Sequence, residues 1–209
     1  HNPSGVRLDP DDLAAVIEAA EERDAWVLVD EVYADFDPQD RPTAAHASPR
    51  VVVTNSLTKA HGLPDLRAGW VLGSEAAIRT IEQWDDLVHP SLPPAPMAQA
   101  AAYIPRSRGL LERTRARAAE RTDLVDAWVQ ATEGVRWVRP DGGVTGFLLF
   151  EAHVDGDELA DRIWNEHGVR TVPGSFFQMR NGLRISYMLE QPQLDQALAA
   201  IATVLGSLR

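Results

Sequence analysis

Residues 51–70 read VVVTNSLTKAHGLPDLRAGW, an apolar run that passes into hydroxyl, lysine, glycine and arginine residues. The valines at 51–53 predict a short buried strand that stops at the polar residues 54–56. Residues 27–36, VLVDEVYADF, have the same form, because the apolar stretch over 26–29 stops at Asp30 and Glu31. Short apolar strands that alternate with helices predict parallel pairing, with both faces of the sheet buried. An α/β fold is therefore expected.

The rest of the chain divides into two parts. Residues 1–108 are expected to form a partial large domain, with helices over 9–23 and 75–87 and a further strand over 69–73. Residues 109–209 are expected to form a smaller α+β domain. A long charged helix should run from residue 107 to about 132, followed by strands over 135–138, 145–150, 169–172 and 183–187 and helices over 155–166 and 191–207.

Composition excludes several classes of function. The 31 acidic and 20 basic residues leave a net charge of -11, the wrong sign for binding nucleic acid or an anionic membrane. No apolar run approaches the ~18 residues that a membrane-spanning helix needs. The absence of cysteine excludes disulfides and thiolate ligands and fits a reducing cytoplasm, where we expect the protein to be. The six histidines show no H-x-H or H-x-x-x-H pair, so no metal site is expected.

Lys59 is the single lysine among the 20 basic residues. An amine that loses its proton can attack a carbonyl and form a Schiff base, whereas a guanidinium stays protonated and is a poor nucleophile. Lys59 is therefore a candidate catalytic residue, unless its survival in an arginine-rich chain is chance.

Polar groups follow both predicted strands, where ligands gather in open α/β sheets. Asp30 and Tyr33 follow the first strand, while Ser56, Thr58 and Lys59 follow the second, with Arg67 shortly after. Hydroxyls and an arginine suit a phosphate ester, the lysine suits an aldehyde, and the carboxylate suits a protonated ring nitrogen. Pyridoxal 5′-phosphate (PLP) meets all these demands.

Other interpretations of the same residues stay open. An apolar strand followed by Asp-Glu also occurs in P-loop ATPases, but the only lysine is not in a G-x-x-x-x-G-K-[ST] motif. Asp30, Ser56 and Thr58 can simply cap a following turn or helix. Arg67 and Arg184 can be ordinary surface ion pairs.

Six motifs in order resemble fold type I PLP-dependent aminotransferases of class I/II, over essentially all 209 residues. They are HNPSG (1–5), VLVDEVYADF (27–36), SLTKAHGLPDLRAGW (56–70), PDGGVTGF (140–147), VPGSFF (172–177) and GLRISY (182–187). The resemblance implies the C-terminal part of the large mixed-sheet domain followed by the small α+β domain. The N-terminal portion of the family, with its glycine-containing phosphate loop and ring-stacking aromatic, has no counterpart here.

The resemblance also implies roles at the cofactor. Lys59 would bind PLP as a Schiff base and shuttle a proton, and Asp30 would pair with the pyridine nitrogen. Ser56, Thr58 and Arg67 would hold the phosphate.

Three further residues complete the implied site. Tyr33 and Asn2 would hydrogen-bond the phenolic oxygen of the ring. Arg184 would grip the substrate α-carboxylate through a bidentate contact.

The expected function is transfer of an amino group between an α-amino acid and a 2-oxo acid, by a homodimer as the resemblance implies. Two alternatives remain. One is a PLP-dependent decarboxylase or lyase of the same fold, against which Arg184 argues because it keeps the carboxylate bound. The other is a noncatalytic half-protein that binds a partner.

Overall fold

The computed structural model describes residues 1–37, 39, 41–89, 91 and 93–208. The chain forms two compact units, which we call the first unit (Leu8–Arg115) and the second unit (Ala116–Arg209 with His1–Arg7). The division falls inside the helix α4 (Ser107–Ala131), and the first seven residues belong with the C-terminal unit. The domain limits of 1–108 and 109–209 stay a prediction for the whole protein.

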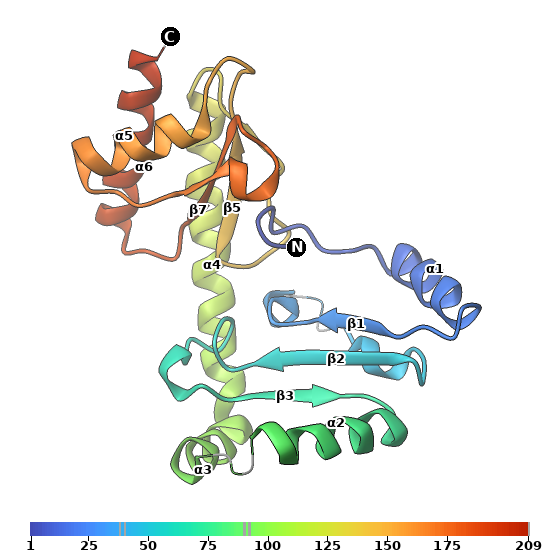
Figure 1. Cartoon of the computed structure of the whole chain (residues 1–209). Coiled ribbons are helices and arrows are strands. Elements are labelled where there is room, and N and C mark those ends of the chain that lie inside the picture. Colours follow the sequence, from blue (N-terminus) through green and yellow to red (C-terminus); the bar gives the residue numbers. More distant parts are fainter. Residues whose placement is uncertain (38, 40, 90, 92, 209) are drawn as a thin grey trace. The chain divides into compact units, whose positions relative to one another are not determined.

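The first unit contains a three-stranded sheet in the order β1-β2-β3 (Figure 1). The parallel strands β1 (Val27–Asp30) and β2 (Val51–Ser56) pair in register from Val27 opposite Val51 to Asp30 opposite Thr54. The strand β3 (Gly69–Leu72) is antiparallel to β2. The three strands expected from the sequence are confirmed, and the α/β character of this part of the chain with them.

One face of this sheet is packed. Val51 and Val53 are fully buried against Ile17 of helix α1 (Pro10–Glu21) and Ala44 of the short 3-10 helix η2 (Ala44–His46). The helix α1 begins where the sequence predicts, because the Asp9 carboxylate accepts a hydrogen bond from the Asp11 N–H at 2.9 Å and Pro10 occupies the first turn.

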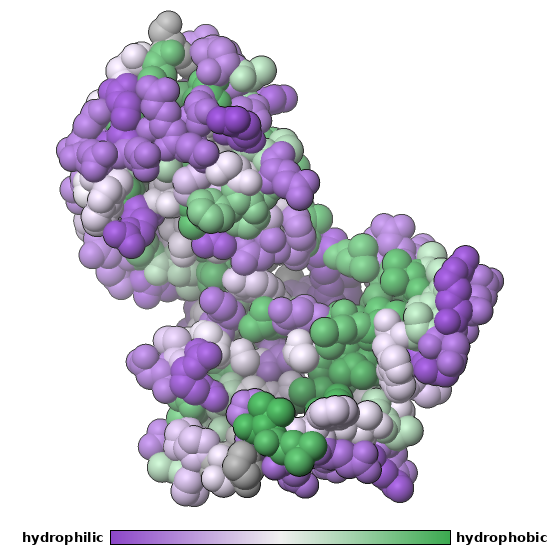
Figure 2. All heavy atoms as spheres, viewed as in Figure 1, coloured by the Kyte–Doolittle hydropathy of each residue, from purple (hydrophilic) through white to green (hydrophobic). Residues whose placement is uncertain are grey.

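The opposite face is open, so the expectation that both faces are buried is wrong for this chain. Leu28, which points away from α1, is 68% exposed, and Val71 of β3 is also exposed. Apolar residues are visible at the surface over this part of the molecule in Figure 2. The strands of a parallel sheet usually have continuous apolar sequences because both faces of the sheet are covered, whereas the described residues of this chain leave Leu28 and Val71 exposed.

Two helices follow the sheet. The helix α2 (Glu75–Val88) begins at Ser74, whose Oγ accepts from the Ala77 N–H at 3.4 Å. The helix α3 (Pro94–Tyr103) was not predicted; its prolines lie in the first turn, where proline is tolerated, and an alanine-rich stretch continues it. Ala100 of α3 packs against Leu57 and Ala68, which flank the turn after β2.

The second unit is an antiparallel sheet with helices, which confirms the expected α+β character. The strand expected over 169–172 is displaced, because residues 169–171 lie outside any strand and the observed strand begins at Val172. Its strands lie in the order β4-β5-β7-β6 (Figure 1). The elements are β4 (Arg136–Trp137), β5 (Thr145–Leu149), α5 (Gly156–His167), β6 (Val172–Pro173), β7 (Gly182–Ser186) and α6 (Gln191–Ser207). Its core joins Leu148 of β5, Leu183 of β7, Ile163 of α5 and Ile201 of α6. Among the described residues, no helix is long and apolar enough to cross a membrane.

The burial of the core predicts that two leucines of the second unit contribute differently to the free energy of unfolding. Leu148→Ala should lower the free energy of unfolding by about 2–5 kcal/mol, because Leu148 is fully buried and the substitution leaves a cavity. Leu189→Ala should change it by less than about 1 kcal/mol, because Leu189 is 37% exposed. Urea unfolding measures both, and equal shifts would contradict the assignment.

Candidate active site

Sheet topology brings the polar residues of the first unit to one edge. The carboxyl ends of β1 and β2 lie together because these strands are parallel. The strand β3 starts at the same edge, where Gly69 lies opposite Ser56. Asp30, Ser56 and Arg67 therefore stand at the ends of three neighbouring strands, in the place where α/β sheets bind ligands.

The loop after β1 is held by short hydrogen bonds. One carboxylate oxygen of Asp30 accepts from the Val32 N–H at 3.0 Å, which leaves its second oxygen for another partner. Both the backbone and the side chain of Glu31 are hydrogen-bonded. Its N–H donates to the Thr54 carbonyl at 2.8 Å, and its carboxylate accepts from the Ala44 N–H at 2.7 Å. Tyr33 begins the 3-10 helix η1 (Ala34–Phe36).

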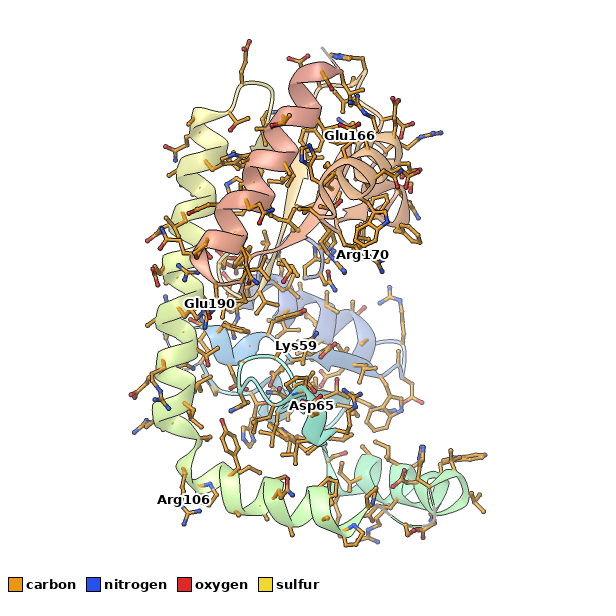
Figure 3. The ribbon with its side chains drawn as sticks, turned by 90° about the vertical axis from the view of Figure 1, so that its left-hand side faces the viewer. Lys59, Asp65, Arg106, Glu166, Arg170 and Glu190 are labelled. Atoms are coloured by element: carbon orange, nitrogen blue, oxygen red, sulfur yellow. The ribbon has the colours of Figure 1, made fainter. Side chains whose placement is uncertain are left out.

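The turn after β2 presents Lys59. Ser56 Oγ accepts from the Thr58 N–H at 3.3 Å, and the Lys59 carbonyl accepts from the Gly62 N–H at 3.1 Å. Gly62 has φ +67°, a conformation that glycine adopts without strain. Ala60 is fully buried, whereas Lys59 is exposed. Figure 3 labels Lys59. Within the described part of the chain, the Lys59 amine has no hydrogen-bond or ion-pair partner.

Arg67 lies in a left-handed backbone conformation, with φ 51° and ψ 34°, directly after the 3-10 helix η3 (Pro64–Leu66). This conformation is unfavourable for most residues by about 1–2 kcal/mol and often marks a functional position. The guanidinium makes only a weak contact of 3.4 Å with the Pro64 carbonyl, and no carboxylate among the described residues pairs with it. The surface ion-pair interpretation therefore does not apply to Arg67.

A second group of polar residues lies at this edge, and its hydrogen bonds include His61, the histidine next but one to Lys59. Asp35 Oδ2 accepts from Asn55 Nδ2 at 3.1 Å and lies 3.2 Å from His61 Nε2. The Tyr103 hydroxyl lies 3.4 Å from the other ring nitrogen of His61. The hydrogen bond with His61 holds the pKa of Asp35 below its ordinary value, against the opposing effect of burial and with a further contribution from Asn55. Burial raises the pKa of Tyr103.

The second unit holds the remaining two predicted residues. Arg184 of β7 donates to the side-chain carbonyl of Asn2 at 3.2 Å, and its guanidinium carbon lies 5.6 Å from the centre of the Phe177 ring. Asn2 and Phe177 also line a cavity of about 310 Å³, whose other walls are His1, Pro3, Ser4, Phe147, Phe176, Gln178 and Met179. As for Arg67, no carboxylate in the described ranges pairs with Arg184.

The structure thus sorts the eight predicted residues into two groups. Six share one sheet edge of the first unit: Asp30, Tyr33, Ser56, Thr58, Lys59 and Arg67. Asn2 and Arg184 form a bonded pair in the second unit. The capping alternative holds in part, since Asp30 and Ser56 each accept from a backbone N–H of the following turn, but no α-helix follows either of them directly.

The fold and these residues define a class of protein, and comparison with known families agrees. The family described as aminotransferase class I and II matches residues 1–201, and the chain belongs to this family. A PLP-dependent aminotransferase from Streptococcus suis superposes with a TM-score of 0.94 at 26% identity, covering 100% of this chain and 56% of that one. The fold is accordingly that of the PLP-dependent aminotransferases of fold type I.

Two relatives carry other names. Capreomycidine synthase of Streptomyces vinaceus is 33% identical over 99% of this chain and 54% of its own length. The PLP-dependent cyclase OrfR superposes with a TM-score of 0.86 at 25% identity, covering 99% of this chain and 57% of that one. The chain therefore spans about half the length of the relatives that it matches.

The left-handed conformation of Arg67 makes a prediction about stability. Arg67→Asn should fold at least as stably as the natural chain, because asparagine accepts this conformation readily and the guanidinium makes no strong contact. Arg67→Val should lose about 1–3 kcal/mol, because a β-branched residue is strained there. Urea unfolding of the two variants provides the measurement, and a valine variant as stable as the asparagine variant would refute the strain.

Proposed function

We propose that the protein containing this chain is a PLP-dependent aminotransferase that moves an amino group between an α-amino acid and a 2-oxo acid. The observation that carries the proposal is Lys59. It is the only lysine of the chain, and its amine, which has no partner among the described residues, follows the strand whose end lies at the same sheet edge as that of Asp30. An amine with no structural partner is available for chemistry.

The residues at this edge fit the cofactor. Arg67 offers a guanidinium fork with no competing carboxylate among the described residues, which suits a phosphate. The Ser56 hydroxyl is used only as an acceptor within its turn, so its proton remains for a phosphate oxygen, and Thr58 offers a second hydroxyl. We assign these three residues to the phosphate.

Asp30 and Tyr33 suit the ring of the cofactor. Asp30 has one oxygen bound to the Val32 N–H, which orients the carboxylate and leaves the second oxygen for a protonated ring nitrogen. Tyr33, three residues further on, offers a phenol to an oxygen of the ring. When bound, PLP supplies an aldehyde that captures amines and a ring that withdraws electrons from the substrate Cα.

The reaction then needs a base and a carboxylate clamp. Lys59 Nζ, once neutral, would accept the proton from the substrate Cα and would return it to the C4′ carbon of the cofactor. Arg184 binds the substrate α-carboxylate and so orients the bond that breaks. Asn2 accepts from Arg184 through its side-chain carbonyl, which orients the guanidinium and leaves the amide N–H groups to donate to the ring oxygen.

Assembly and location are further parts of this proposal. A homodimer and a cytoplasmic location follow from the family resemblance and from the cysteine-free composition, and α-amino acids with 2-oxo acids are the proposed partners.

A second candidate is PLP-dependent cyclisation. The similarity to the PLP-dependent cyclase OrfR favours it, because that protein is matched over 99% of this chain. Lys59, Asp30 and Arg67 would serve either reaction, since both require an electron-withdrawing cofactor and a base at Cα.

Covalent capture of the cofactor tests the shared part of both candidates. The natural protein should develop visible absorbance with PLP, and borohydride should fix the cofactor on the peptide that contains Lys59. Lys59→Arg should show no such band and should lose activity by at least about 10²-fold, the low end of what a positioned base contributes. Peptide mass mapping locates the adduct.

A surface lysine provides the matched control. Arg106→Lys places a second amine on an exposed position, and the fixed cofactor should remain on Lys59 alone. Labelling of both amines in equal amount would show that exposure, rather than the site, selects Lys59. A natural protein without any adduct would support the noncatalytic alternative.

The products separate transfer from cyclisation. The natural protein, loaded with PLP, is given an amino acid and a 2-oxo acid. Transfer predicts that the nitrogen label of the donor appears on the acceptor. Cyclisation predicts that the donor is consumed while the acceptor stays unlabelled, and release of CO₂ would instead indicate a decarboxylase.

A further inference from the structure

We propose that His61 is a positioning residue for Lys59, because its hydrogen bond with Asp35 fixes the Lys59–Gly62 turn against the loop that carries Tyr33. This inference rests on the proposed function, since it concerns the amine that the cofactor would occupy. It assigns a role to residues that the phosphate, ring and carboxylate contacts leave unused.

The pair joins the two loops that carry the site. Asp35 lies two residues after Tyr33, in the 3-10 helix that follows β1. His61 lies two residues after Lys59, in the turn that follows β2. Asn55, next to Ser56, donates to the same Asp35 oxygen as His61 does. Two hydrogen bonds thus converge on one carboxylate and connect the strand-end loops through their side chains.

The direction of these hydrogen bonds follows from the charge on Asp35. Its pKa lies below the ordinary value, so the carboxylate is ionised at neutral pH and only accepts. His61 Nε2 is therefore protonated and donates the hydrogen bond to Asp35 Oδ2, at 3.2 Å. In the neutral ring the other nitrogen accepts, and the Tyr103 hydroxyl is its donor at 3.4 Å.

Burial makes the arrangement specific. The His61 side chain is only 8% exposed, and it packs edge-on against Tyr103 and Trp70 with ring centres 5.9 Å and 6.4 Å away. A buried polar nitrogen without a partner is unfavourable, so the ring is held in the one orientation that reaches Asp35. Asp35 is itself held, because its backbone carbonyl accepts from Arg115 Nε at 2.5 Å.

An apolar ring would fill the same space. A phenylalanine at position 61 would keep the contacts with Tyr103 and Trp70 but would lose the link to Asp35. His61 therefore fixes the position of the turn through its hydrogen bond, in addition to filling the space. Lys59 has a flexible four-carbon stem and no partner of its own in the described ranges, so the position of its amine depends on the backbone of this turn.

Two substitutions of His61 separate packing from positioning. His61→Phe preserves the ring shape and removes the donor, whereas His61→Gln preserves a donor near the Nε2 position. The measured quantity is the rate at which PLP becomes covalently attached at saturating concentration, followed by its visible absorbance in the natural-length protein. His61→Phe should slow attachment by about 10- to 100-fold, the effect expected of a displaced reacting group, and His61→Gln should restore most of the rate.

A second readout excludes a merely structural effect. In a Lys59→Ala background, PLP binds without the covalent link, and its dissociation constant reports the phosphate and ring contacts. Adding His61→Phe to that background should leave this constant unchanged. A weaker constant would show that His61 shapes the whole pocket and would overturn the assignment to Lys59.

The matched control is a second histidine–aspartate pair among the described residues of the same unit. His89 Nδ1 lies 3.0 Å from the Asp85 carboxylate at the exposed end of α2, away from the strand-end loops in the sequence. His89→Phe should not change the attachment rate. Equal rates in His61→Phe and the natural protein would refute the positioning role and leave the proposed function intact. No attachment in the natural protein would refute the proposed function itself.

Discussion

The parallel hydrogen bonding of β1 to β2 is the constraint on which the site depends. Asp30 lies opposite Thr54, so both strands end at the same edge and their following loops meet there. A shift of the β1–β2 pairing register by one residue would turn every side chain of one strand to the other face of the sheet. It would also move Asp30 away from the turn that carries Lys59. The antiparallel return of β3 adds Arg67 to the same edge, since Gly69 pairs with Ser56 at the point where a side chain would lie only 2.8 Å from the Asn55 carbonyl.

Much of this arrangement was predictable from local patterns. The valines at 51–53 and the apolar stretch before Asp30 predict β2 and β1, and the strand ends predict that the candidate site residues lie at one sheet edge. The link between Asp35 and His61 was not predictable, because it joins residues 26 positions apart and requires the pairing register of two strands. The exposure of Leu28 was not predictable for a related reason. An apolar sequence indicates that both faces of a strand are buried in the folded protein, but it does not identify the segment that packs against each face.

The same residues are compatible with more than one reaction. The family name describes amino transfer, yet a synthase and a cyclase match the chain over nearly its whole length. The base, the carboxylate and the phosphate clamp that we propose would hold the cofactor in either reaction, and they would not decide what happens after the proton leaves Cα. In the proposal that choice depends on the groups around the substrate, among which we place Arg184, which is bonded to Asn2.

The exposed side chain of Lys59 has a practical consequence. Since it is the sole ε-amine of this chain, an acylating or reductively methylating reagent has one side-chain target in these 209 residues. If an aldehyde binds Lys59 as we propose, it would shield the nitrogen from the reagent, and the extent of modification would measure the fraction of chains that carry the aldehyde. Because arginine takes the place of lysine at the other basic positions, an amine-specific reagent modifies a single side chain.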